Sequence, residues 1–258
     1  MDGTAAPEED QIRQHPTWSA LLAGLLLAGA LAGCDGAAQA GTGLPDIFDG
    51  GPGVALGQPA GEHSARDFEP QRAVEALTAL ETIPIKGRAP KTGYSREEFG
   101  AAWADVDRNG CGTRNDILAR DLEAETFKPG TRDCVVSTGI LADRYTGTTI
   151  SFVRGDKTSA AVQIDHLVPL SDAWQKGARQ LSAEQRKQFA NDPLNLMAAD
   201  GSTNGAKGDK DAATWLPPNK AFRCEYVARQ TAVKAKYQLW VTPAEHDAIA
   251  TVLAACLS

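Results

Sequence analysis

The feature that most restricts what this chain can fold into is an uncharged apolar run near its N-terminus, Ala20–Ala32, which reads ALLAGLLLAGALA. This run of 13 residues suits the core of a signal peptide, whereas a transmembrane helix needs about 20. It leads into Leu31-Ala32-Gly33-Cys34, where small residues suit a signal peptidase and the cysteine resembles the lipobox of lipoproteins. We therefore expect residues 1–33 to be a lipoprotein-type signal peptide, with its lipobox at 31–34, and Cys34 to carry a lipid.

Two other readings of the N-terminus stay open, an uncleaved anchor and an ordinary secretory cut nearby. The flank before the apolar run fits a signal peptide poorly, because it holds Asp2, Glu8, Glu9 and Asp10 against only Arg13. A positive flank is the usual pattern.

The cysteines indicate an oxidising compartment. Besides Cys34 there are four, at Cys111, Cys134, Cys224 and Cys256, and an even count in an exported chain predicts two disulfides. Three pairings can be drawn; we prefer Cys111–Cys134 and Cys224–Cys256, because each joins segments close in sequence.

The rest of the chain divides by composition. Residues 34–66 are rich in Gly, Ala, Pro and Asp, which predicts a flexible tether because such a segment buries too little apolar surface to fold alone. We expect residues 67–258 to form one domain. The net charge of the whole chain is −7, but residues 154–240 carry 13 Lys and Arg against 9 Asp and Glu. A mildly basic segment is compatible with a polyanionic substrate, although it is more often a solvated surface.

Helix signals are frequent in this domain. Val74, Leu77 and Leu80 lie at helical spacing and predict an amphipathic helix over 70–81. A second helix is expected over 220–236, burying Phe222, Tyr226 and Val233. Three capping boxes predict further helix starts: Ser95 with Glu98, opening a helix with Phe99 and Trp103 on one face; Ser182 with Gln185, opening one that ends near Ala190; and Thr242 with Glu245, where Pro243 takes the first position and Ile249, Val252, Leu253 and Cys256 point inward.

Strand signals lie between Cys134 and Leu170. Runs rich in β-branched residues at 134–138, 148–153 and 161–164 are separated by Gly139, Gly147 and Gly155, which predicts three short strands. No internal repeat is visible. The expected fold class is therefore α+β.

One stretch carries the residues that chemistry needs. Asp165-His166 follows directly on the third predicted strand, and Pro169 stops that strand from continuing as a central one. Asn204 and Lys207 are three apart, so a helix starting there would present both on one face. Hydrolysis of a phosphodiester needs a base that is active near neutral pH, oxygen ligands for a hard cation and positive charge near the phosphate.

This stretch resembles the HNH endonuclease motif, in the form found in secreted bacterial HNH proteins related to the C-terminal nuclease domain of the GmrSD restriction enzymes. The similarity covers about residues 90–256, and the order and spacing of its fragments carry it more than any one fragment does. The fragments are Ile164–Leu170, Asn191–Leu196 and Asn204–Asp209, with Cys111–Arg114, Asp143–Gly147, Trp174, Gly177–Ala178, Phe189–Asp192 and Trp215 around them.

The resemblance implies a ββα-metal core inside a mostly helical, disulfide-stapled domain, and it implies a role for each motif residue. His166 is the expected general base, and Asp165 and Asn204 are the expected metal ligands. Asn195 is expected to hold the loop that bears the histidine, and Lys207 to lie near the phosphate. One Mg²⁺ or Mn²⁺ per active site is expected, since oxygen ligands favour these over zinc. Because adjacent strand residues face opposite sides, Asp165 and His166 can share a site only if the backbone turns near them.

For several residues near the motif, a purely structural role is the alternative interpretation. For Arg114 and Arg120, a salt bridge to Asp116, Asp121 or Glu123 is expected before a phosphate contact, and Lys207 could be a solvated helix lysine. Trp174 and Trp215 are expected in the core rather than as stacking platforms for bases. His63 and His246 have no partner that would suggest catalysis.

The resulting expectation is an exported metal-dependent endonuclease, largely nonspecific in sequence, acting on DNA rather than RNA. It would be secreted, or held by a Cys34 lipid on the extracellular face of the membrane or in the periplasm, with no obligate protein partner. The alternative is a non-catalytic lipoprotein binding module that keeps the nuclease fold. A zinc peptidase or amidase is disfavoured because the chain has no His-Glu-x-x-His, and a serine hydrolase because it has no Gly-x-Ser-x-Gly.

Overall fold

The computed structural model describes residues 68–257. The expected signal peptide, Cys34, the tether and His63 lie outside this range. In the described part no helix is long and apolar enough to cross a membrane.

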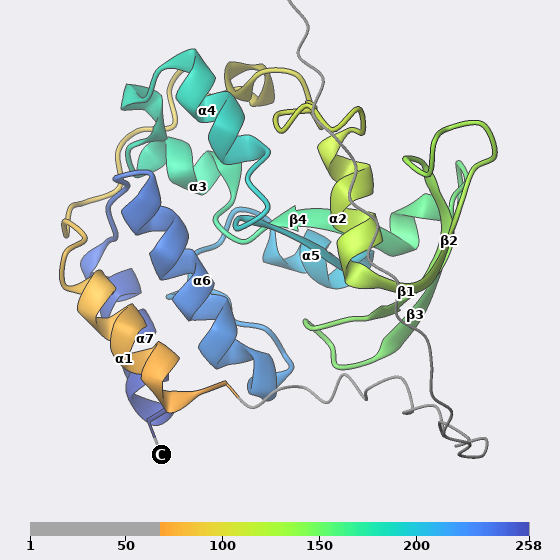
Figure 1. Ribbon diagram of the computed structural model, residues 1–258. Helices are drawn as coiled ribbons and strands as arrows, with labels where there is room; N and C mark the ends of the chain where they lie inside the picture. Colours follow the sequence, from red (N-terminus) through yellow and green to blue (C-terminus); the bar gives the residue numbers. More distant parts are fainter. Residues whose placement is uncertain (1–67, 258) are drawn as a thin grey trace, which may run out of the picture. The chain divides into compact units, whose positions relative to one another are not determined.

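The domain combines a helical side with two small antiparallel sheets (Figure 1). The α-helices are α1 (Pro70–Leu80), α2 (Thr113–Asp121), α3 (Leu170–Gln175), α4 (Ala183–Ala190), α5 (Gly201–Lys207), α6 (Arg223–Lys236) and α7 (Pro243–Ala255), and short 3₁₀ turns are η1 (Arg96–Phe99), η2 (Ser159–Ala161), η3 (Ala178–Gln180) and η4 (Lys220–Phe222). One sheet has the order β1–β2–β3 and the other is the pair β4–β5; the strands are β1 (Leu122–Phe127), β2 (Val136–Ala142), β3 (Thr149–Val153), β4 (Val162–His166) and β5 (Leu196–Asp200). The α+β class is confirmed.

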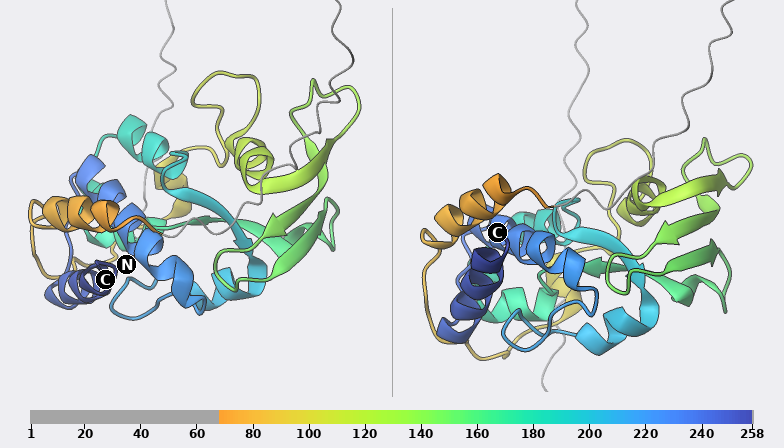
Figure 2. Two further views of the ribbon diagram at one scale, coloured as in Figure 1. Left: turned by 60° about the horizontal axis from the view of Figure 1, so that its bottom comes forward. Right: turned by 90° about the horizontal axis from the view of Figure 1, so that it is seen from below.

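The pair β4–β5 is buried on both faces and lies between two hydrophobic clusters. Leu196 and Ala198 of β5 belong to the cluster under α2 and the three-stranded sheet, whereas Met197 and Ala199 belong to the cluster under α1, α6 and α7. Because successive side chains of a strand point to opposite faces, β5 packs against one hydrophobic cluster on each face. The views in Figure 2 show α1, α6 and α7 together on one side of the pair and β1–β3 on the other.

Most of the expected helices are present. The Ser182–Gln185 capping box is formed in both directions at the start of α4, and Thr242 caps α7 with Pro243 at its first turn. In α7, however, the Glu245 side chain does not complete the box. It is buried and pairs with Lys176 at 2.6 Å and with Lys234 at 2.8 Å, which ties α7 to α6 and to the end of α3.

One helix prediction was wrong. Ser95 makes no side-chain cap, and the segment after it is the 3₁₀ turn η1, because Glu98 pairs with Arg186 of α4 instead of reaching back. Trp103 therefore lies in a turn, with a φ of 57°, and not on a helix face. The helix expected over 70–81 is present as α1, but its buried face differs from the expected one: Ala73, Ala76 and Leu80 are buried, while Val74 is 45% exposed.

The strands differ from expectation in extent and number. Gly139, expected to end a strand, pairs with Phe152 inside β2, and β1 and β5 were not anticipated. At Gly139 a Cβ would lie 2.9 Å from the Leu122 side chain, so the absence of a side chain is what lets the neighbouring strand pack there.

Both expected disulfides are confirmed. Cys111–Cys134 joins the start of α2 to the approach of β2, and Cys224–Cys256 joins α6 to the end of α7. They close loops with sequence separations of 23 and 32 residues. A crosslink of this span stabilises a domain by about 3–4 kcal/mol, chiefly by restricting the unfolded chain.

Candidate active site

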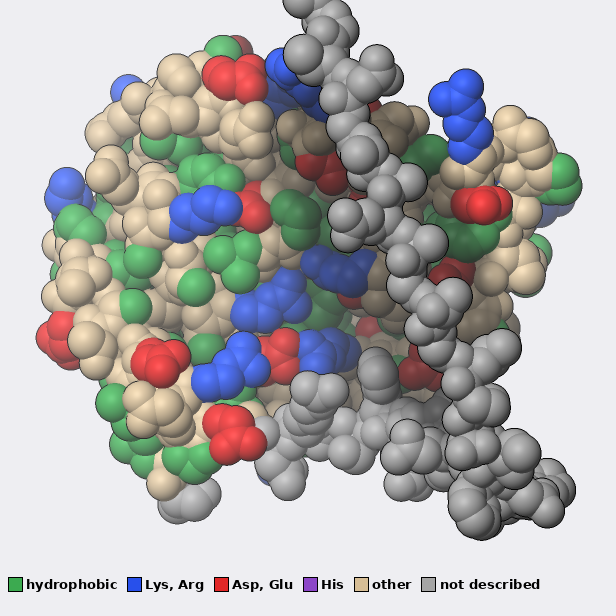
Figure 3. All heavy atoms as spheres, in the orientation of Figure 1, with side chains coloured by type: hydrophobic (Ala, Val, Ile, Leu, Met, Phe, Trp, Pro, Cys, Tyr) green, Lys and Arg blue, Asp and Glu red, His purple; other side chains and the backbone are tan. Residues whose placement is uncertain are grey.

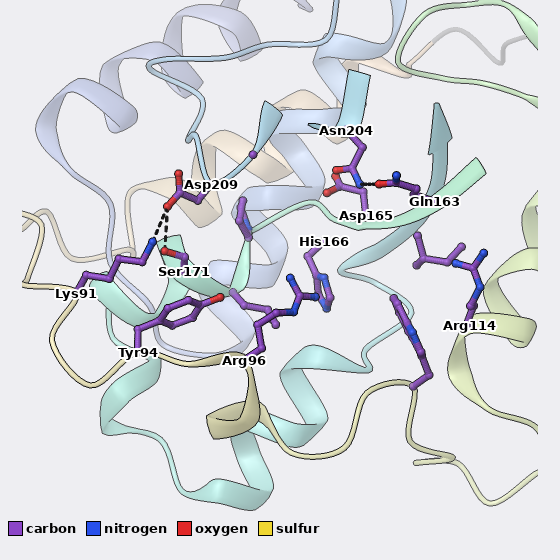
Figure 4. Close-up of a pocket in the computed structure, with 15 residues that line it drawn as sticks. Lys91, Tyr94, Arg96, Arg114, Gln163, Asp165, His166, Ser171, Asn204 and Asp209 are labelled. Carbon is purple, nitrogen blue, oxygen red and sulfur yellow. Dashed lines mark hydrogen bonds and ion pairs between the residues drawn. The ribbon is translucent and has the colours of Figure 1, made fainter. Parts of the chain in front are cut away.

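A cavity of about 510 Å³ opens where β4 ends. Figure 4 shows side chains from several segments around it: Arg96 from η1, Asp165 and His166 from β4, Asn204 from α5 and Arg114 from α2. The structure thus brings together three of the five expected site residues, His166, Asp165 and Asn204. Asn195 and Lys207 do not line the cavity: Lys207 binds Asp165 and the His166 carbonyl, whereas Asn195 binds the backbone of Val168.

His166 is buried and fixed by one hydrogen bond. Its Nε2 lies 2.8 Å from the carbonyl oxygen of Ala190 at the end of α4. Because a carbonyl only accepts, Nε2 carries the proton in this contact, which leaves the lone pair on Nδ1. Nδ1 has no hydrogen-bond partner in residues 68–257.

The environment of His166 keeps the ring neutral. Burial lowers its pKa to about 4, and the positive charges of Arg96 and Lys207 act in the same direction, while the Ala190 carbonyl and Asp165 oppose them. At neutral pH the imidazole is therefore an unprotonated base.

Trp103 stacks against the His166 ring, with the two rings nearly parallel at 19° and 6.2 Å between their centroids. Its left-handed backbone is unusual for a bulky residue. The ring thus restricts His166 on one side while Ala190 holds its Nε2.

Asp165 faces the other way along the strand and is held by two buried groups. The Tyr145 hydroxyl donates to Oδ2 at 2.5 Å, and the Lys207 ammonium lies 3.0 Å from both carboxylate oxygens. Neighbouring strand residues face opposite sides, yet Asp165 and His166 line the same cavity, because β4 ends at His166. The two side chains can therefore share one site, as the resemblance required.

Lys207 lies in a different place from the one expected. It is fully buried, and its ammonium donates to Asp165 and, at 2.8 Å, to the carbonyl oxygen of His166. It is not among the residues that line the cavity. The structure therefore makes it a support for the Asp165–His166 pair, and the reading as a solvated lysine is wrong.

Helix α5 carries both Asn204 and Lys207, and it begins at Gly201 rather than at Asn204. A Cβ at Gly201 would lie 2.0 Å from the carbonyl oxygen of Ala160, so only glycine permits this close approach to η2. The Asn204 amide nitrogen donates to Oε1 of Gln163 on β4 at 2.9 Å. This contact fixes the amide and leaves its Oδ1 as an acceptor beside Asp165.

Asn195 is fully buried immediately before β5 and binds the backbone of Val168 twice. Its Oδ1 accepts from the Val168 N–H at 2.8 Å, and its Nδ2 donates to the Val168 carbonyl at 3.3 Å. A backbone bond from Leu167 to the Asn195 carbonyl adds to these. The loop that follows His166 is thereby held against β5.

Several cavity residues were missed or misjudged from the sequence. Arg120 does pair with Asp121, as expected, but Arg114 makes no ion pair with any described residue and lines the cavity. Arg96 lies in the segment taken for a helix and also makes no ion pair there. Lys91 pairs with Asp209, which accepts from Ser171. No local sequence signal marks these residues, since each reaches the cavity from a different element.

The remaining candidates are structural. Trp174 packs against Phe99 and Tyr94, and Trp215 against Tyr145 and Tyr226, so both are core residues as expected. The His246 ring lies outside the cavity, and its Nδ1 is 3.4 Å from the Asp247 carboxylate. On the face drawn in Figure 3, basic side chains gather over α6 with acidic ones beside them, so that face alone does not mark an interface with nucleic acid.

The chain matches one protein family and one curated relative. Residues 112–252 match the family model described as GmrSD restriction endonucleases, C-terminal domain. A curated relative from Arthroderma benhamiae, named an uncharacterized secreted protein, is 34% identical over 186 residues, which cover 71% of this chain and 86% of the relative. No solved structure matches the chain. The chain belongs to the family of GmrSD restriction endonuclease C-terminal domains.

Proposed function

We propose that this protein is a metal-dependent endonuclease that hydrolyses phosphodiester bonds, with His166 as general base. The observation that carries the proposal is the state of His166, a buried neutral imidazole with Nε2 bound to Ala190 and no hydrogen-bond partner for Nδ1 among residues 68–257, at a cavity that Asp165 also lines. A general base for attack by water needs this combination of protonation state, orientation and access.

The order of elements around the cavity supports an HNH assignment. Antiparallel strands β4 and β5 are followed directly by α5, and the long segment 167–195 is inserted between the strands. Asp165 and His166 end β4, Asn195 precedes β5 and Asn204 lies on α5. This is the order that a ββα nuclease core requires of its motif residues.

In this mechanism the Nδ1 of His166 accepts a proton from the attacking water. The Ala190 carbonyl holds the other ring nitrogen, so the ring stays oriented as it becomes positively charged. Lys207 holds the carbonyl of His166 itself, and Asn195 holds the backbone two residues further on, at Val168. Arg96 and Arg114 supply positive charge at the cavity for the phosphate.

The donor set fits one hard divalent cation. Tyr145 and Lys207 occupy about three of the four lone-pair sites of Asp165, which leaves one for a ligand bond. The free Oδ1 of Asn204 is a second oxygen donor beside it. Mg²⁺ or Mn²⁺ suits such a site, because these ions use few protein oxygens and complete their shell with water and phosphate. When bound, the cation supplies charge that stabilises the phosphate and the leaving oxygen.

We further propose that the substrate is DNA rather than RNA and that the protein is exported. The relative from Arthroderma benhamiae is named a secreted protein, and two disulfides suit an oxidising compartment. Anchoring through a lipid on Cys34 stays a proposal from the sequence.

The test is a cleavage assay with the purified, disulfide-bonded protein on plasmid DNA and on RNA, in Mg²⁺, Mn²⁺ or EDTA. Cleavage that needs the divalent ion and is lost in His166→Ala is the expected result. His246→Ala is the matched control, because that histidine lies outside the cavity, and it should cleave as the wild type does. A folded protein that cleaves neither polymer would instead support the non-catalytic binding module.

A further inference from the structure

A second cavity of about 380 Å³ adjoins the catalytic one. The two share four residues: Arg96, Trp103, His166 and Leu170. Whatever occupies the second cavity therefore lies beside the proposed general base.

The two cavities differ in chemistry. The catalytic one is lined by charged and amide side chains, whereas the second is lined mainly by apolar groups and by the turn after η1. These apolar residues are Phe99, Ala101, Ala102, Trp103, Leu170 and Ala190. A flat apolar ring would fit such a lining, and a phosphate would not.

Trp103 stands between the cavities in a costly backbone conformation. It has a φ of 57°, a half-buried indole, and no hydrogen-bond partner for its N–H in the described part of the chain. Left-handed backbone at a bulky residue persists only where its surroundings require it, and such residues gather at sites that hold ligands. Arg96, exposed and without an ion pair among residues 68–257, adjoins it with its guanidinium directed toward His166 (Figure 4).

We propose that the second cavity binds an unpaired nucleobase of the substrate. The base stacks on Trp103, and Arg96 holds the adjacent scissile phosphate. This inference rests on the proposed nuclease function and adds a preference for single-stranded nucleic acid. Inside a duplex both faces of each base are already stacked, so a base must leave the helix before it can enter such a cavity.

The test separates bases from backbone charge. Binding to the wild-type protein is measured in EDTA, without turnover, for a short oligothymidylate and for a base-free oligomer of the same length and charge. Because one stacked base changes affinity about tenfold, the oligothymidylate should bind about tenfold more tightly. A duplex of half the length, which carries about the same number of phosphates, should bind like the base-free oligomer.

The variant Trp103→Leu keeps apolar volume but removes the aromatic face, so its preference for the oligothymidylate should fall towards onefold. Trp103→Phe should retain most of the preference, and thermal unfolding checks that both variants fold. Equal affinity of the wild-type protein for both oligomers would overturn the proposal. If the protein cleaves but binds both oligomers equally, the base-binding proposal is wrong and the nuclease function stands. If it prefers the oligothymidylate but does not cleave in Mg²⁺, the nuclease function is wrong and the base-binding proposal stands.

Discussion

Asn195 holds Val168 by both of its backbone polar groups, the N–H at 2.8 Å and the carbonyl at 3.3 Å. The two residues are far apart in sequence, and Val168 is only two residues after His166. A buried side chain that does not line the cavity thus sets where the loop after His166 lies.

Replacing Asn195 with alanine should lower both stability and cleavage. The change leaves two buried backbone groups of Val168 unpaired, which costs about 2–4 kcal/mol of unfolding free energy, and it frees the loop after His166. Urea unfolding and plasmid cleavage measure the two effects. Asn219→Ala is the control, because that side chain also binds two backbone groups, at Arg144 and Ala221, outside the cavity. Equal cleavage losses in both variants would contradict a specific role for Asn195.

The buried imidazole of His166 should make stability depend on pH in the weakly acidic range. Burial lowers its pKa to about 4 in the folded protein, against about 6.5 in an unfolded chain. Between these values the unfolded chain binds a proton that the folded chain does not, so stability rises with pH across this window and is lost as the pH falls.

On going from pH 7 to pH 4 in EDTA, the wild type should therefore lose about 3 kcal/mol more unfolding free energy than His166→Gln, which cannot titrate there. Chemical unfolding at several pH values measures the difference between the two proteins. Parallel stability curves for the two would show that the ring is not buried in its neutral form.

Lys207 should matter far more than its neighbour Lys210, although both are basic residues at the end of α5. Lys207→Met removes the cation from the buried Asp165 carboxylate, and breaking a buried pair in this way costs about 3–5 kcal/mol. Lys210 is exposed, and its ammonium donates to the Ala206 carbonyl and to no other group among the described residues, so Lys210→Met should change stability by less than about 0.5 kcal/mol. Thermal or urea unfolding of the two variants measures the loss of stability in each. Similar small losses in both would mean that the Lys207 ammonium is solvated rather than buried against Asp165.

These cases show which parts of the fold follow from sequence and which do not. The Ser182–Gln185 cap is local and was predicted, whereas the same pattern at Ser95 failed because Glu98 pairs with Arg186, far along the chain. Strand β5 reads LMAAD, without β-branched residues or alternation, because both its faces are buried. The motif predicts that His166, Asp165 and Asn204 lie together, and the three residues line one cavity. It could not place Lys207, whose partner Asp165 lies 42 residues away, nor Arg114, whose exposure to the cavity depends on how α2 packs against β4.

Arg114 should contribute to binding through charge, without sequence preference. It lines the cavity at the end of β4 and makes no ion pair within residues 68–257, and only one of its guanidinium nitrogens has a hydrogen-bond partner there, the Val162 carbonyl at 3.5 Å. Its remaining N–H groups are therefore available to a phosphate. Arg114→Gln should weaken duplex binding and reduce the slope of log affinity against log salt by about 1, the value for one lost phosphate contact. Filter binding in EDTA at several salt concentrations measures the slope. Arg179→Gln, at an exposed position that does not line the cavity, should leave it unchanged. A slope that Arg114→Gln does not alter would place the phosphates elsewhere on the surface and leave Arg114 a structural residue of α2.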